Sequence, residues 1–188
     1  MSNASKKLAD DSKRGFTLVE LLVVIGVLAI LTAAVVVVLN PAELLAQARD
    51  TQRMSDLDAI RGAVSLYLVA TTTPVFGTTV YSTSGTDGFN CGAATARDVY
   101  TIDGNGWITI DFSTMTNPSS PISALPRDPV NNATNHYVYK GDNTDKNFEL
   151  NAQLESSKYA STKETNDGGS STTVYEVGTD PGLTLCNS

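Results

Sequence analysis

One carboxylate lies inside the most apolar part of the chain, and its position suggests a specific partner. Glu20 stands in the run from Phe16 to Leu39, in which nearly every other residue is apolar. A carboxylate in a membrane helix costs on the order of a few kcal/mol unless something compensates it. A cut between Gly15 and Phe16 would create an α-ammonium group at Phe16. Glu20 of the same or a neighbouring helix could then neutralise that ammonium, because ion pairing is strong in an apolar medium.

The apolar run is long enough to cross a membrane. No residue from Leu21 to Ala42 is charged, a stretch of about 22 residues that can span a bilayer as a helix. Cations before the run predict that the leader stays in the cytoplasm and that everything after the span is exported. They are Lys6, Lys7, Lys13 and Arg14. A secretory signal peptide is disfavoured because the run is too long and no A-x-A cleavage site follows it. A plain single-pass anchor leaves Glu20 unexplained.

The residues around this cut resemble a known processing site. The run Lys13-Arg14-Gly15-Phe16-Thr17-Leu18-Val19-Glu20-Leu21-Leu22 resembles that of type IV prepilins and of the pseudopilins of type II secretion. The resemblance implies that a membrane-embedded prepilin peptidase cleaves after Gly15 and methylates Phe16, and that Glu20 is the assembly glutamate. It also implies three kinds of partner: further copies of the chain, an inner-membrane assembly platform, and the ATPase of that platform.

An amphipathic segment follows Asn40-Pro41. Apolar residues recur there at helical spacing and charged residues take the other sides, so the helix is predicted to continue to about Val69. Pro41 predicts either a kink or a simple break between two helices. The apolar stripe is Leu57, Ile60, Val64, Tyr67 and Leu68, and the charged residues are Arg49, Asp50, Arg53, Asp56 and Arg61.

The chain from Thr71 onward is rich in polar turn formers, and short strands are predicted between the turns. The candidate strands are Val99–Ile102, Trp107–Phe112, Tyr137–Lys140, Phe148–Glu155 and Val174–Val177. The predicted fold class is α+β, a pilin fold in which a long N-terminal helix spans the membrane with its first half. Its second half packs on a small antiparallel sheet. The predicted parts are a removed leader (1–15), a transmembrane and filament-core helix (16–40), its amphipathic continuation (41–70) and an extracytoplasmic sheet domain (71–188).

Two cysteines and two aspartates are the remaining candidates for special chemistry. Cys91 and Cys186 are expected to form a disulfide if the domain lies outside the cytoplasm; the alternative is two unrelated thiols. Similarity to G-type pseudopilins, which hold a calcium ion in their C-terminal region, makes Asp167 and Asp180 weak calcium candidates. The alternative for both aspartates is a plain turn. No other cofactor is expected.

Nothing in the sequence favours catalysis or nucleic-acid binding. No GxSxG, HExxH or Walker pattern is present, so the energy for extension must come from another protein. The single histidine, His136, is expected to be a surface or sheet residue. The net charge of −7 disfavours a phosphate backbone as partner. The Asn132-Ala133-Thr134 triplet fits a glycosylation acceptor, but chance explains it better.

The sequence therefore predicts a structural subunit without enzymatic activity. It would reside in the inner membrane as a precursor and then in a cell-surface or periplasmic filament. The cysteine pair favours a pilus and the sheet region favours a pseudopilus of type II secretion, so both remain open. A membrane-anchored domain that never polymerises is a different class, which predicts an intact Gly15–Phe16 bond and tolerance of Glu20→Ala.

Overall fold

The computed structural model describes residues 15–187 and divides after Pro41 into two units. Residues 1–14 of the predicted leader lie outside the described part. The first unit contains helix α1, Leu18–Leu39. Its segment Leu18–Val36 has a mean hydropathy of 2.8 and no buried residue, and within 15–187 it is the one helix long and apolar enough to cross a membrane. This helix has the composition that a lipid environment requires.

The helix is broken rather than continuous at Asn40. Helix α1 ends at Leu39, Asn40 has left-handed backbone angles (φ 41°, ψ 75°), and helix α2 extends from Pro41 to Ala70. Proline disfavours the helical conformation of the residue before it, but fits the first position of a helix. Asparagine tolerates the left-handed region better than most residues. Of the two outcomes predicted for Pro41, the structure therefore has the break.

A five-stranded mixed sheet forms the centre of the second unit, with strand order β2-β1-β3-β4-β5. Strands β3, β4 and β5 form an antiparallel meander, β1 pairs antiparallel with β3, and β2 pairs parallel with β1. The strands are β1 (Tyr81–Ser82), β2 (Thr95–Ala96), β3 (Tyr137–Asp142), β4 (Asn147–Ala152) and β5 (Tyr175–Gly178). The remaining elements are α3 (Ser157–Lys163), η1 (Phe89–Cys91), η2 (Phe112–Thr114) and η3 (Leu185–Asn187).

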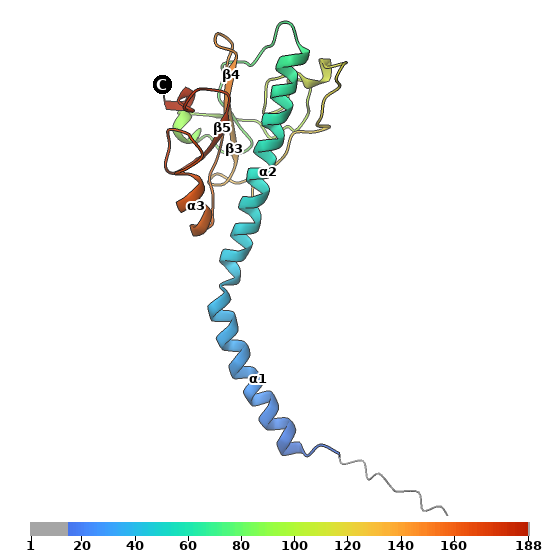
Figure 1. Ribbon diagram of the computed structural model, residues 1–188, viewed down its shortest axis with the longest axis vertical. Helices are drawn as coiled ribbons and strands as arrows, with labels where there is room; N and C mark the ends of the chain where they lie inside the picture. Colours follow the sequence, from blue (N-terminus) through green and yellow to red (C-terminus); the bar gives the residue numbers. More distant parts are fainter. Residues whose placement is uncertain (1–14, 188) are drawn as a thin grey trace, which may run out of the picture. The chain divides into compact units, whose positions relative to one another are not determined.

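Helix α2 packs along one face of this sheet and supplies the apolar core (Figure 1). Leu57, Ile60 and Val64 are completely buried, and Tyr67 is nearly so. They meet the β3 and β4 side chains that point to the same face, namely Tyr137, Tyr139, Phe148, Leu150 and Ala152. The predicted stripe and its packing on a sheet are thus confirmed, as is the α+β class.

The opposite face of the sheet is polar and also buried. Glu149 and Asn151 of β4 and Glu176 of β5 point to this face and have at most 1% of their surface exposed. Short helix η1 covers this face through Asn90, which bonds to both Asn151 and Glu176. Short helix η3 covers it through Cys186, whose N–H donates to Glu149. Apolar and polar residues alternate along β4, so one face of the strand lines the apolar core and the other lines a buried polar layer.

The predicted strands 99–102 and 107–112 are wrong. These segments are joined by a bridge between Asp103 and Asp111 and by backbone bonds from Trp107 N–H to Val99 and from the N–H groups of residues 112 and 113 to Ile102. Beside the segments, aspartate side chains accept from local backbone donors: Asp103 accepts from Asn105 N–H in the turn, and Asp111 accepts from the N–H of residue 113. Such side-chain bonds compete with strand pairing. The predicted turn between the segments is present, and their apolar side chains enter the core.

The other three strand predictions are confirmed with shifted ends. Strand β3 matches the prediction and extends two residues further, and β5 is shifted by one residue. Strand β4 ends at Ala152 rather than Glu155. It ends early because the N–H groups of Glu155 and Ser156 donate to Asp50 of helix α2 instead of to a neighbouring strand.

Candidate processing and assembly site

The predicted cleavage site lies directly before a capped helix end. Gly15 and Phe16 are exposed, and Thr17 is the N-cap of α1. The Thr17 hydroxyl accepts a hydrogen bond from Glu20 N–H at 3.2 Å. In return, the Glu20 carboxylate accepts from Thr17 N–H at 2.8 Å and from the Thr17 hydroxyl at 2.7 Å. This reciprocal arrangement is a capping box, which satisfies backbone donors that a helix start leaves open.

The capping box gives Glu20 a role that the sequence analysis did not anticipate. Both bonds from Thr17 end on Oε2 of the carboxylate, so Oε1 is left for a further partner. The box also fixes the carboxylate beside the helix N-terminus, where the helix dipole favours a negative charge. Thr17 therefore acts as a positioning residue for Glu20.

Thr17→Ala is expected to loosen the start of α1 without removing the charge of Glu20. Loss of an N-cap side chain costs about 1 kcal/mol, so the backbone amide of Glu20 should exchange about fivefold faster with solvent deuterium. Hydrogen exchange of the full chain in detergent micelles measures this effect. Thr17→Ser keeps a hydroxyl and should exchange like the wild type. Equal exchange in all three proteins would contradict the capping box.

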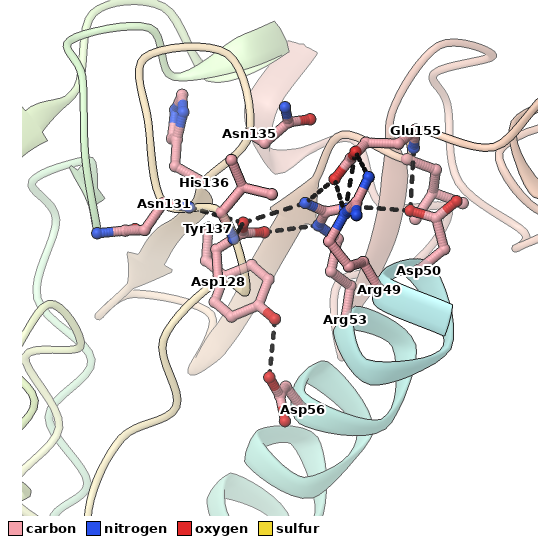
Figure 2. Close-up of polar contacts among 12 residues, drawn as sticks. Arg49, Asp50, Arg53, Asp56, Asp128, Asn131, Asn135, His136, Tyr137 and Glu155 are labelled. Atoms are coloured by element: carbon pink, nitrogen blue, oxygen red, sulfur yellow. Dashed lines mark hydrogen bonds and ion pairs between the residues drawn. The ribbon is translucent and has the colours of Figure 1, made fainter. Parts of the chain in front are cut away.

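A second polar site connects helix α2 to segments on either side of strands β3 and β4 (Figure 2). The Arg53 guanidinium, which is fully buried, donates to Asp128 at 2.6 and 3.1 Å, to Asp50 at 2.8 Å and to Glu155 at 2.5 Å. Arg49 also donates to Glu155, with distances from 2.5 to 3.1 Å. We call these five residues the Arg53 cluster. It joins α2 to the loop before β3 and to the segment after β4.

Backbone donors complete the bonding of the buried carboxylates in this cluster. Asp128 accepts from the N–H groups of residues 130 and 131, and Asp50 accepts from those of residues 155 and 156. Burial opposes the charge of Arg53, but the carboxylates of Asp128 and Glu155 raise its pKa above the ordinary value. Burial likewise opposes the charge of Asp128, yet Arg53 and the backbone donors hold the pKa of Asp128 below its ordinary value. Arg53 and Asp128 are therefore both charged near neutral pH.

The prediction that the charged residues of α2 lie away from the core is wrong for Asp50 and Arg53. Both are completely buried, Arg49 and Asp56 are half-buried, and of the five only Arg61 is exposed. Asp56 accepts a hydrogen bond from the buried hydroxyl of Tyr137 at 2.8 Å. A signal was available: the buried positions of α2 include 46, 50, 53, 57, 60, 64 and 67, an alternation of four and three residues. Extending the apolar stripe backwards from Leu57 finds Arg53 and Asp50.

The cysteines and the other singled-out residues have local structural roles. Cys91 and Cys186 form a disulfide, the pairing that the sequence analysis expects. His136 is buried directly before strand β3 and stacks on Phe89 at 4.6 Å between ring centres, so of the two positions predicted for it the surface is wrong. Asp167 accepts from the N–H groups of residues 169 and 176. Asp180 accepts from those of residues 184 and 185. Both aspartates thus shape turns, and calcium binding stays a prediction.

Glu149→Gln is expected to remove a loss of stability that occurs as the pH rises from about 4.5 to 7. Burial, helped by the nearby Glu176 carboxylate, raises the pKa of Glu149 from 4.5 to about 7. The folded state therefore holds this proton more tightly than the unfolded state does. The stabilisation is complete below about pH 4.5 and is lost as the pH rises through about 7, and it amounts to about 3 kcal/mol in total.

Urea unfolding of the full chain at several pH values, followed by fluorescence of the buried Trp107, measures this dependence. Wild type should lose stability between about pH 4.5 and 7, and Glu149→Gln should lose much less. Asp145→Asn removes an exposed carboxylate and should behave like wild type. Parallel pH curves for Glu149→Gln and wild type would contradict the prediction.

Comparison with known families agrees with this reading of the N-terminus. Residues 10–36 match the family model of the prokaryotic N-terminal methylation motif. No curated protein and no solved structure gives a significant match to the chain. The matched region covers the predicted cleavage site, the capping box and most of helix α1. The chain thus carries a prepilin-type N-terminal methylation motif on an apolar helix suited to membrane anchoring, which is consistent with a type IV pilin or pseudopilin and points to a structural protein rather than an enzyme.

Proposed function

We propose that the chain is the structural subunit of a type IV pilus-like filament. A prepilin peptidase cuts it after Gly15, Phe16 becomes the methylated N-terminus, and the subunits polymerise through α1. The observation that carries the proposal is the methylation motif over residues 10–36, placed on a helix whose apolar side chains are exposed along its length. Those side chains need lipid in the precursor and other helices in a polymer.

Glu20 guides assembly in this proposal. Cleavage frees the amine of Phe16, and the Oε1 atom that Thr17 leaves open receives the amine of a neighbouring subunit. The medium around α1 is apolar, so the pair is strongly attractive and an unpaired charge is costly. This pairing sets the axial position of each new helix.

Close packing of the α1 helices then forms the filament core. Small residues let helices approach closely in a dry bundle, and α1 has several: Gly26, Ala29, Ala33 and Ala34. The second unit is acidic and well packed, and we place it at the outer, water-exposed surface of the filament. Within this unit, the Arg53 cluster holds α2 against the sheet. The precursor resides in the inner membrane, where an assembly platform and its ATPase supply the work of extension.

Electron microscopy of surface-sheared material tests the proposal. Cells that make the chain should release thin fibres that bind an antibody raised against residues 71–188. Cells that make a Gly15→Val chain, which should resist the peptidase, should release none and retain the chain in the membrane. A chain that is always extracted from membranes by detergent, and never found in fibres, would instead be a non-polymerising anchored domain.

A pseudopilin of type II secretion is the alternative within the same class, because the N-terminal motif is common to both. The two are separated by deleting the chain and measuring exported proteins in the medium. A pilin deletion should remove surface fibres and leave secretion unchanged. A pseudopilin deletion should trap secreted proteins in the periplasm, with no fibres lost from the surface.

A further inference from the structure

Two sulfurs and a carboxylate meet on the polar face of the sheet. Ligand atoms of Cys91, Cys186 and Glu149 all lie within 4.8 Å of one another. No other group of three such histidine, cysteine or acidic side chains occurs within residues 15–187. The three residues come from η1, η3 and β4, and Glu149 and Cys186 are buried. Three separate elements therefore bring metal-ligating atoms together in the interior.

One oxygen of the Glu149 carboxylate is buried without a hydrogen-bond donor or a cation beside it among the described residues. Its Oε2 accepts a hydrogen bond from Cys186 N–H at 3.1 Å. Its Oε1 is buried and receives no hydrogen bond from the described residues, and the same is true of Oδ1 of the neighbouring Asn151. A buried carboxylate oxygen without a partner is costly. A proton can relieve this cost, and so can a metal ion.

Surrounding side chains hold these groups in place. The Asn90 side chain donates to Glu176 at 2.6 Å and accepts from Asn151 at 2.6 Å, which fixes the residue before Cys91. Glu176 brings a second carboxylate close to Glu149, so the site has an excess of negative charge. Such outer contacts orient ligands and raise metal affinity.

We propose that, when its two thiols are reduced, the protein binds one zinc ion through Cys91, Cys186 and Glu149. Two thiolates and one carboxylate are a donor set that zinc accepts in tetrahedral geometry. Zn–S bonds of about 2.3 Å in tetrahedral geometry place the two sulfurs about 3.8 Å apart, so the two cysteine side chains must separate from their bonded position. Water or the Glu176 carboxylate takes the fourth position.

Zinc and the disulfide are then alternative cross-links between Cys91 and Cys186. Binding releases one proton from each thiol, and one from Glu149 where that group is protonated, and it transfers no electrons. The disulfide form offers no thiolate and cannot bind in this manner. Either closure joins residues that are 95 positions apart in the sequence. Before the disulfide forms, a zinc ion bound to both cysteines cross-links η1 and η3.

Cobalt titration of the full chain in detergent tests this proposal. The protein is reduced, freed of metal with a chelator and kept anaerobic, and Co²⁺ serves as the spectroscopic probe before zinc competes for the site. Reduced wild type should take up one equivalent, with a thiolate-to-cobalt charge-transfer band and the visible bands of a tetrahedral site. Disulfide-bonded wild type should show neither, and this comparison needs no variant that might misfold.

Variants assign the ligands. Glu149→Gln should weaken binding at least about tenfold, while Glu164→Gln, which alters a buried carboxylate outside the site, should bind like wild type. Cys186→Ser should lose much of the charge-transfer intensity. The proposal is overturned if reduced wild type shows no tetrahedral cobalt signal, if the oxidised chain binds equally well, or if Glu149→Gln retains full affinity.

Discussion

Arg53→Met is expected to lower the free energy of unfolding of the second unit by about 3–5 kcal/mol, because it leaves buried carboxylates without their cation. Methionine fills much of the same space, so the loss reports the missing charge and hydrogen bonds rather than a cavity. The side chains of Asp50 and Asp128 are both fully buried. Without Arg53, each carboxylate would have to carry a buried charge with no cation beside it or take up a proton. The midpoint of urea unfolding, followed by Trp107 fluorescence of the full chain, measures the effect.

Arg61→Met is the matched control for this change. Arg61 lies on the same helix but is exposed, and its nearest acidic partner, Asp58, is 4.0 Å away. Exposed pairs of this kind contribute little, so the control should stay within about 0.5 kcal/mol of wild type. The effect of Arg53→Met should also shrink as the pH falls towards about 4, since protonated carboxylates no longer need the cation. A loss below about 1 kcal/mol for Arg53→Met would show that the cluster does not hold α2.

Glu20→Gln is expected to abolish filament yield while leaving the start of α1 intact. Glutamine keeps the capping box with Thr17, because a neutral amide oxygen accepts the same hydrogen bonds. It cannot neutralise the amine of a neighbouring Phe16, and an unpaired buried charge costs on the order of 3–5 kcal/mol at each contact. The yield of sheared filaments per cell, measured by immunoblot, should therefore fall to background.

Three further variants separate charge from capping. Glu20→Ala should fail like Glu20→Gln, Glu20→Asp should retain partial assembly, and Thr17→Ala should assemble because it keeps the carboxylate. Processing after Gly15 should persist in all of them. If Glu20→Gln assembles like wild type, then Glu20 serves the helix cap of its own chain and the pairing between subunits does not exist.

The N-terminal part of the molecule was largely predictable because its signals are local. The run around Gly15, Phe16 and Glu20 and the apolar stretch that follows need no tertiary contact to be recognised. The capping box is local as well, because Thr17 and Glu20 have its three-residue spacing, so the sequence alone could have predicted it. Helix α2 and strands β3 to β5 followed from periodicity, and their boundaries were within three residues.

The features that the sequence did not predict depend on tertiary contacts or on segments too short to carry a pattern. Asp50 ends strand β4 by accepting backbone donors more than a hundred positions away along the chain, so the length of β4 could not be found from its own residues. Segment 107–112 alternates like a strand, but Asp103 and Asp111 accept hydrogen bonds from the local backbone, and the apolar side chains of both segments enter the core without a ladder. Strands β1 and β2 have two residues each, too few to carry a pattern.

The intact mass of the chain recovered from sheared cell-surface material tests the central claim most directly. The pairing of Glu20 requires a free amine at Phe16, which exists only after the cut. We expect a fibre subunit with the mass of residues 16–188 plus one methyl group. Recovery of the chain only as residues 1–188, and only in the membrane fraction, would contradict it.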